Sequence, residues 1–327
     1  MGIIHLIFIP GLSNSREYKT QDGGLVSFEI VDCHTIPRDS MLRARAISCT
    51  EREGDMAGHD KRARNPLVAK LLQFTPLSDE DIRVLEALCS SEKRFKGGVD
   101  ILAEGDAMRS TFIVTHGTAC RYRLLSDGRR QVLSFFIPGD FFGLHAFLLG
   151  SIDHFIGTVG PTRLAEIDRD TVIEMVTHHP RIRAALWWSA RQEDAMLRER
   201  IVALGRRSAR GRVAYLLCEL VWRQRATGVN EGDVIRLPLT QIDLADALGL
   251  TPIYVNRILQ AFRREQLITL QQHQLTLLDV EKLQTISGVT PDYLQLGTIS
   301  PDIIDYFDPL GRSLGARSAI QRRRALC

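Results

Sequence analysis

The chain of 327 residues is long enough for about two domains with buried cores, and with 44% hydrophobic and 25% charged residues it has the composition of an ordinary soluble globular protein. Its formal net charge of +3 identifies no class of partner by itself. The six cysteines, at positions 33, 49, 89, 120, 218 and 327, lack the close spacing of a zinc site or a disulfide scaffold, which fits a reducing, cytoplasmic setting.

Residues 1–60 do not show the pattern of a folded domain. Their composition shifts from apolar to glycine-rich to charged without a sustained period of 3.6 or 2 residues. The apolar run Ile3–Ile9 is too short to span a bilayer and lacks a basic leader, so we expect neither a signal peptide nor a membrane anchor. Helical patterning begins only after Met56. We therefore expect an irregular extension, with Met56 as an alternative start of the native protein.

Residues 66–180 are predicted to form short helices followed by an antiparallel β-roll. Helical patterns cover residues 66–88, with a break at Thr75–Leu77 and Ser78 as the cap of the second helix. Between residues 94 and 168, short apolar runs alternate with turn pairs such as Pro138-Gly139 at about ten-residue spacing, which is typical of a barrel or jelly roll. The expected strands are 112–114, 119–125, 132–137, 155–159 and 163–167.

Three further helices are expected between residues 170 and 225. A short one covers residues 170–179, a long one covers residues 181–205, and a third runs from Ser208 to Arg225. In the long helix, apolar side chains recur every three or four residues, which favours a seam between two copies of the chain; the alternative is packing within one chain. These apolar positions are Ile182, Leu186, Ala190, Leu197, Ile201 and Leu204.

The most informative stretch lies within residues 206–281, which we predict to be a winged helix-turn-helix. Thr240 caps a first helix with Asp243 as its capping-box partner, Gly249 ends it, and Thr251-Pro252 begins a second helix. The second helix has one apolar face, formed by Val255, Ile258, Leu259 and Phe262. Its other face is free to enter a major groove. The candidate DNA contacts are Thr240, Gln241, Thr251, Ile253, Tyr254, Asn256, Arg257, Gln260 and Arg264.

The segments around this motif support the same interpretation. Residues 198–264 contain 12 arginines, 6 acidic residues and no lysine, which predicts a surface facing phosphates; a solvated helical face is the alternative. Residues 267–279 alternate about a turn near Gln272-His273, as in a β-hairpin wing. Residues 282–327 contain scattered prolines and glycines and a basic end, so we expect a poorly structured tail.

A β-roll, a long helix and a winged helix-turn-helix, in this order, resemble the Crp/Fnr family of bacterial transcription regulators. The most specific parts are PGDFFG at residues 138–143 and LPLTQIDLADALGLTPIYVNRIL at residues 237–259. The resemblance covers residues 66–281 and implies an α+β fold and a transcription regulator that is not an enzyme. It further implies a homodimer that binds double-stranded DNA at two half-sites roughly 34–36 Å apart, with RNA polymerase as a further candidate partner.

The resemblance also assigns roles to residues of the second helix. Arg257 matches the family's base-contacting arginine, which can donate two hydrogen bonds to guanine, worth about 1–3 kcal/mol of discrimination. The alternative for Arg257 is a phosphate contact or a surface salt bridge. Thr240 and Thr251 stand where members hold phosphates. Ile253 replaces a glutamate that members often carry, and Pro252 replaces an arginine found in some. Since Ile253 can meet a thymine methyl group but cannot accept a hydrogen bond from cytosine, the family's familiar target sequences are not expected here.

The effector is unknown, and no cofactor is predicted. Cyclic-nucleotide-binding members carry a glutamate after the PGDFFG-like motif and an Arg-Ser or Arg-Thr pair later. Here Leu144 and Asp153-His154-Phe155 stand instead, so a buried nucleotide would lack polar partners and tight binding of cyclic AMP is not expected. Any effector pocket is expected near Phe142, Gly143, Leu144, His154 and Phe155.

Metal cofactors have weak support in the sequence. Cys33 and Cys49 are too far apart for the family's iron–sulfur cluster, and no metal site is predicted. Haem stays open, with His116, His145 or His154 as an axial ligand, although a lone histidine in a β-roll is more often structural.

Two other classes of protein compete with a DNA-binding regulator. A cupin-like metal enzyme would need a close His-x-His and carboxylate group, which the widely spaced histidines do not provide. A ligand-responsive module that regulates a partner protein would not need the helix-turn-helix.

Overall fold

The computed structural model describes residues 16–19, 25–28, 65–107, 109–144, 151–228 and 234–296. The chain divides into two units, residues 1–61 and residues 62–327. In the first unit, strand β1 (Arg16–Lys19) pairs antiparallel with β2 (Leu25–Phe28). The irregular extension predicted for residues 1–60 therefore contains a strand pair that its sequence pattern did not indicate. The alternative start at Met56 lies outside the described residues.

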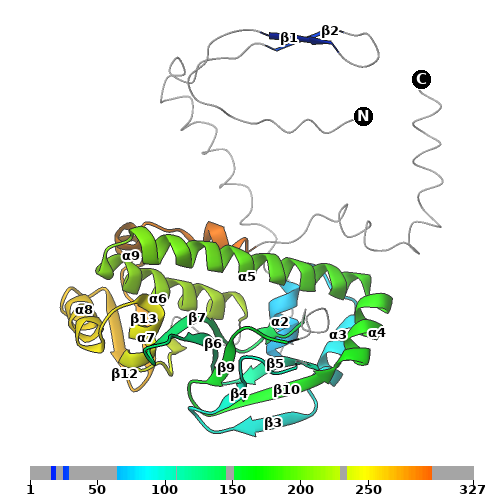
Figure 1. Ribbon diagram of the computed structural model, residues 1–327, viewed down its shortest axis with the longest axis horizontal. Helices are drawn as coiled ribbons and strands as arrows, with labels where there is room; N and C mark the ends of the chain where they lie inside the picture. Colours follow the sequence, from blue (N-terminus) through cyan, green and yellow to red (C-terminus); the bar gives the residue numbers. More distant parts are fainter. Residues whose placement is uncertain are drawn as a thin grey trace. The chain divides into compact units, whose positions relative to one another are not determined.

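The first half of the second unit is built around a β-roll made of two antiparallel four-stranded sheets (Figure 1). The order in the first sheet is β3 (Glu92–Phe95), β10 (Thr162–Asp168), β5 (Ser110–His116) and β8 (Phe141–Phe142). The order in the second is β4 (Asp100–Leu102), β9 (Phe155–Thr158), β6 (Ala119–Leu124) and β7 (Arg130–Phe136). All five expected strands are confirmed. The sequence missed β3, β4 and β8 because they are short, and β3 and β4 lack an apolar run.

The inner faces of the two sheets enclose a small apolar core. In β5, Phe112 and Val114 point into this core, whereas Ile113 between them packs on the opposite side, as the two-residue period of a strand requires. The ring of Phe142 stacks on Phe112 at 5.3 Å and lies 5.2 Å from the ring of Phe136. This core positions β8 and the turn that precedes it.

Helices cover the outer face of the first sheet. They are α2 (Pro66–Leu72), α3 (Asp79–Leu88), α4 (Arg169–His178) and the first part of α5 (Pro180–Arg206). The expected break between α2 and α3 is confirmed, and Ser78 begins α3 by accepting a hydrogen bond from the Asp81 amide at 3.1 Å. The turn after β7 lies so close to α2 that a Cβ on Gly139, which has a φ of 92°, would be 2.4 Å from the Pro66 carbonyl oxygen.

The long helix α5 has 27 residues, or ~40 Å at 1.5 Å per residue, and connects the β-roll to the C-terminal half. The prediction that its apolar positions form one seam is wrong in part. Ile182 and Leu186 are buried against the β-roll, because they face the sheet side of the helix. Ile201 is 71% exposed and Trp187, which the prediction omitted, is 65% exposed.

The C-terminal half is a winged helix-turn-helix. Its helices are α6 (Ala209–Ala226), α7 (Gln241–Leu248) and α8 (Pro252–Arg264). Its sheet has the order β11 (Val234–Arg236), β13 (Gln274–Leu277) and β12 (Ile268–Gln271). The predicted wing is confirmed, and its turn residues Gln272 and His273 have φ values of 48° and 62°. The sequence missed β11, which is only three residues long.

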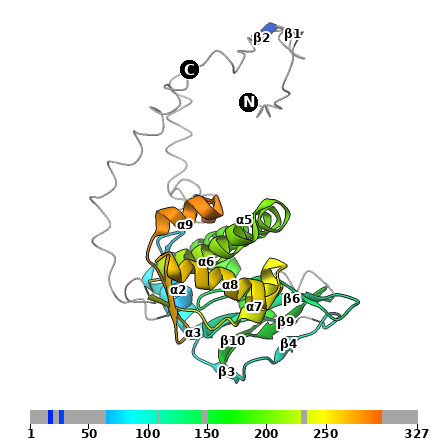
Figure 2. The same cartoon turned by 90° about the vertical axis from the view of Figure 1, so that its left-hand side faces the viewer.

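The β-roll and the winged helix-turn-helix share one continuous core. The outer face of β6 and β7 contributes Cys120, Tyr122, Val132 and Phe135, which pack in the same cluster as side chains of α6, α7 and α8. Both views show α7 beside the hairpin of β6 and β7 (Figures 1 and 2). The winged helix-turn-helix is therefore docked on the second sheet.

The prediction of a poorly structured tail from residue 282 is wrong for its first part. After the wing, α9 (Val280–Ser287) and the short helix η3 (Pro291–Leu294) fold back onto α6 and α5, and the side chains of Leu283 and Leu294 are completely buried. The sequence pattern did not indicate α9 and η3, because their buried residues are few and widely spaced. Residues 297–327 lie outside the described part. No helix among the residues described is long and apolar enough to cross a membrane.

Candidate nucleic-acid interface

The two helices of the motif begin and end where the sequence predicts. The Thr240 hydroxyl accepts from the Asp243 amide at 3.2 Å, while the Asp243 carboxylate accepts from the Thr240 amide at 2.9 Å. Gly249 ends α7 in the left-handed conformation, with a φ of 61°. The Thr251 hydroxyl then accepts from the Tyr254 amide at 3.3 Å and begins α8, with Pro252 in its first turn. This tight connection fixes α8 against α7.

Helix α8 separates its residues into a buried and an exposed face. The apolar face is buried as predicted and comprises Val255, Ile258, Leu259 and Phe262. On the other side Ile253 is 77% exposed, and the Arg257 guanidinium lies 5.9 Å from the centre of the Tyr254 ring. All nine predicted contact residues are exposed except Asn256, which is half-buried. The exposed residues among them carry polar, cationic and apolar groups.

The predicted arginine-rich surface needs correction. Arg200 and Arg223 are buried, Arg207 forms an ion pair with Glu199 of α5, and Arg210 forms one with Glu265. The charges of these four arginines therefore meet carboxylates of the same chain. The exposed arginines of α8 are Arg257, Arg263 and Arg264.

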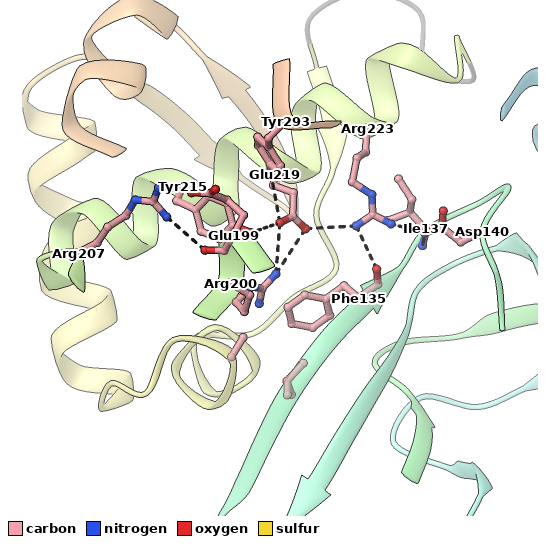
Figure 3. Close-up of polar contacts among 12 residues, drawn as sticks. Phe135, Ile137, Asp140, Glu199, Arg200, Arg207, Tyr215, Glu219, Arg223 and Tyr293 are labelled. Carbon is pink, nitrogen blue, oxygen red and sulfur yellow. Dashed lines mark hydrogen bonds and ion pairs between the residues drawn. The ribbon is translucent and has the colours of Figure 1, made fainter. Parts of the chain in front are cut away.

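The buried arginines belong to a polar network centred on Glu219 of α6 (Figure 3). The Glu219 carboxylate lies 3.4 Å from Nη2 of Arg200 on α5 and 3.4 Å from Nη1 of Arg223 on α6. It also accepts hydrogen bonds from the hydroxyls of Tyr215 and, at 3.5 Å, Tyr293 of η3. Burial and the nearby carboxylate raise the pKa of Tyr215 above its usual range. The network thus ties α5, α6 and η3 together.

Arg223 continues the network into the β-roll. Its guanidinium donates to the Phe135 carbonyl oxygen at 3.1 Å and pairs with Asp140 of the PGDFFG motif. Asp140 also contacts Lys70 Nζ at 2.6 Å and accepts from the Ile137 amide at 2.8 Å. Burial alone would raise the pKa of Asp140, but Arg223 and Lys70 hold it below its ordinary value. The motif's aspartate therefore joins the β-roll to the C-terminal half.

Three side chains predicted to line an effector pocket pack in different hydrophobic clusters. Phe142 lies in the core between the sheets, Leu144 packs against the helices outside the first sheet, and Phe155 stacks on Tyr122 at 5.1 Å. The half-buried ring of His154 lies 2.7 Å from an Asp153 carboxylate oxygen, and burial lowers its pKa. The pocket stays a prediction.

A cavity of about 160 Å³ lies elsewhere, between turns of the β-roll and the end of α6. Its lining includes His116, Gln224 and Arg236, and none of the five predicted pocket residues, all of them described, belongs to it. His116, one of the candidate haem ligands, is exposed there, and His145, another, lies outside the described residues. In the part of the chain that the structure describes, no group of three or more His, Cys, Asp or Glu side chains could hold a metal ion.

Comparison with known proteins gives the same architecture. Residues 92–179 match the model of the cyclic nucleotide-binding domain, and residues 211–286 match that of the Crp-like helix-turn-helix domain. The chain is 30% identical over 195 residues to the nitrogen fixation regulation protein FixK of Bradyrhizobium diazoefficiens, covering 59% of this chain and 81% of that one. The chain belongs to the Crp/Fnr family of transcription regulators. The FixK protein of Rhizobium meliloti is 36% identical over 178 residues, covering 54% of this chain and 77% of that one.

Solved structures of the Crp/Fnr family show the same fold. FixK2 of Bradyrhizobium japonicum matches with a TM-score of 0.54 and 24% identity, over 61% of this chain and 98% of that one. A CooA mutant of Carboxydothermus hydrogenoformans matches with a TM-score of 0.50 and 22% identity, over 65% and 98% of the two chains. The two family models and the FixK relatives, rather than these structures, show that this protein is a Crp/Fnr-type transcription regulator with a helix-turn-helix DNA-binding domain. Its relatives are regulators too.

Sequence reasoning missed the polar groups that hold this Crp/Fnr chain together. Asp140 meets Arg223 across 83 residues of sequence, and Arg200 meets Glu219 across 19. A local pattern cannot indicate pairs this far apart. The one available signal was the repetition of arginine in a predicted amphipathic helix that also carries a glutamate, Glu219.

Proposed function

We propose that this Crp/Fnr regulator is a homodimer that reads a two-fold symmetric duplex site with α8. The observation that carries the proposal is the exposed face of α8, where Ile253, Arg257 and Gln260 are accessible while the opposite face is fixed in the core. A helix that is anchored on one side and bears hydrogen-bond donors on the other suits the major groove of B-DNA.

The residues divide by the part of the duplex that they meet. Arg257 is the principal base contact, a bidentate donor to guanine, and Ile253 meets a thymine methyl group. Thr240 and Thr251, at the N-termini of α7 and α8, hold phosphates together with Gln241. Tyr254, Asn256, Gln260 and Arg264 complete the surface. Because Ile253 accepts no hydrogen bond, this surface selects a different sequence from that read by members with a glutamate there.

The exposed face of α5 supports the homodimer. Trp187 at 65%, Ile201 at 71% and Val202 at 46% exposure are large apolar side chains on a helix that otherwise packs well. Pairing this face with a second copy would remove it from water and set the distance between the two α8 helices. The proposed seam is therefore this face, and it excludes the buried Ile182 and Leu186.

The effector proposal follows from the β-roll. A phosphate-bearing nucleotide needs cationic or polar partners, yet Leu144 is apolar and His154, with its lowered pKa, adjoins the Asp153 carboxylate. We therefore propose that cyclic AMP does not bind tightly and that the effector is another molecule or none. As a regulator of transcription the protein acts with the chromosome in the cytoplasm, and RNA polymerase is its further candidate partner.

Selection of bound sequences from random duplex DNA by the purified full chain, without added ligand, tests the function. A two-fold symmetric motif is expected, with half-sites about one helical turn apart. Recovery of no motif, with and without a panel of metabolites, would contradict it.

The same selection with Arg257→Ala tests the reading helix. One guanine in each half-site should lose its preference, with a cost of about 1–3 kcal/mol per half-site. Arg263→Ala is the matched control, because Arg263 is exposed on α8 but lies off the face formed by Ile253, Arg257 and Gln260. Arg263→Ala should keep the motif. Identical motifs from both variants would assign base reading to other residues.

A further inference from the structure

Arg130, the first residue of β7, makes a contact that joins the β-roll to the helix-turn-helix. Its Nε donates to Asp246 at 2.9 Å and its Nη2 donates to Asp243 at 2.8 Å, so that one guanidinium holds two carboxylates of α7. Beside it, the Gln131 side-chain amide donates to the Ala247 carbonyl oxygen at 3.4 Å. These contacts span more than one turn of α7, which fixes the direction of the helix as well as its distance.

The surroundings of Arg130 strengthen this contact. The side chains of Arg130 and Asp246 are 28% and 26% exposed and that of Asp243 is 11% exposed, so water screens the ion pairs only in part. The guanidinium also lies 5.3 Å from the centre of the Tyr122 ring, a cation–π contact within the same sheet. Burial alone would lower the pKa of Arg130, but the hydrogen bonds to Asp246 and Asp243 raise it.

Strand β7 is in fact attached to the DNA-binding half at both ends. At its start Arg130 holds α7, and at its end the Phe135 carbonyl oxygen accepts from Arg223 of α6, which also pairs with Asp140 in the next turn. Val132 is buried between these attachments in the core that β7 shares with α6 to α8. Two attachments and an apolar contact between them restrain rotation of the C-terminal half against the β-roll.

The position of α8 follows from that of α7. Asp243 uses one carboxylate oxygen for Arg130 and the other for the N-cap of α7, and at the other end of α7 the short turn at Gly249 leads directly into α8. The docked arrangement leaves the reading face open, with Ile253 77% exposed. Docking of α7 on β7 therefore leaves the exposed face of α8 accessible to DNA.

We propose that Arg130 is a positioning residue for DNA reading, which fastens α7 to β7 and so sets the direction in which each β-roll presents its α8. The inference rests on the proposed function and adds a part of the chain outside the DNA-binding half to the machinery of recognition. Arg130 would set how the two α8 helices are arranged and would not change which bases they read.

The test compares the full-length protein with Arg130→Gln on the selected site. Arg130→Gln should bind about tenfold more weakly with the same preferred sequence, which is the scale of coupling carried by contacts remote from the ligand. The dependence of affinity on salt should keep its slope, whereas loss of a phosphate contact would reduce the slope by about 0.9. Arg129→Gln is the matched control, because Arg129 is 77% exposed and pairs with Asp127 in its own hairpin. It should bind as the unsubstituted chain does.

A double-mutant cycle shows whether the effect passes through α7. Asp246→Asn removes a partner of Arg130 that does not cap the helix, and adding it to Arg130→Gln should cost less than the sum of the two single losses. Additive losses, a reduced salt slope, or affinity equal to or above that of the unsubstituted chain would overturn the inference. If the unsubstituted chain fails to bind DNA, the proposed function fails instead, so the two failures are distinguishable.

Discussion

Glu219 illustrates how much a single carboxylate can hold in place at the residue scale. It is 1% exposed and lies within 3.4 Å of both Arg200 and Arg223. Glu219→Gln keeps the shape of the side chain but removes the charge that these buried guanidinium groups contact. We expect the free energy of unfolding to fall by about 3–5 kcal/mol, because an uncompensated charge would stay buried. Urea titration followed by circular dichroism measures the loss.

The control for this substitution is Asp194→Asn on α5. Asp194 contacts Arg191 and Arg198, but its side chain is 59% exposed, so water screens both pairs. Its loss should change the free energy of unfolding by less than about 1 kcal/mol. Equal losses in the two variants would show that the network around Glu219 contributes no more than a surface ion pair.

The sequence predicts single residues well where a local rule decides and poorly where a distant partner does. The cap at Thr240, the turn at Gly249 and the exposure of Arg257 each follow from neighbours within one or two helical turns. Ile182 and Ile201 of α5 were both assigned to the predicted seam, yet the fold buries the first and exposes the second. Arg130 gave no local signal, because its carboxylate partners lie 113 and 116 residues away.

At the scale of elements, the segment after the wing acts as a strap across α5 and α6. Leu294 is completely buried, and its carbonyl oxygen accepts a hydrogen bond from the side-chain Nε2 of Gln192 at 2.8 Å. The Gln295 carbonyl oxygen accepts one from the indole Nε1 of Trp188 at 3.3 Å. We expect Leu294→Ala to lower the free energy of unfolding by about 2–5 kcal/mol, because it leaves a cavity under the strap. Leu296→Ala, at a side chain 38% exposed, should change it by less than about 0.5 kcal/mol. Thermal unfolding of both variants compares them, and similar values would mean that the strap is not packed in solution.

Elements that repeat a strong pattern over many residues were predicted closely, and weaker ones were not. The long helix α5, with 27 residues, and α8, with one apolar and one polar face, follow directly from 3.6-residue periodicity. Strand β11 has three residues and η3 has four, too few for any period, and their places depend on the wing and on α5. Whether short elements of this kind form depends on the core against which they pack.

At the scale of the whole molecule, the proposed DNA site requires two copies held at a fixed separation. Ile201 is the most exposed of the large apolar side chains on α5, which makes it the sharpest test of the seam. Ile201→Glu should leave the fold of one chain intact, since the side chain is 71% exposed. In a dimer, however, it would bury two carboxylates at an apolar contact. We expect the dissociation constant of the dimer to rise by about a hundredfold or more.

Sedimentation velocity over a range of protein concentrations measures this change. Ile173→Glu is the matched control, because Ile173 is 39% exposed on α4 and is not part of the proposed seam, so this variant should not alter the dimer. Ile201→Glu should also lose most of its affinity for the symmetric site, while a single half-site, which needs one α8, should bind the two variants equally. Dimers of unchanged stability in Ile201→Glu would place the seam on another face. The separation of the two reading helices would then be set by contacts other than those of α5.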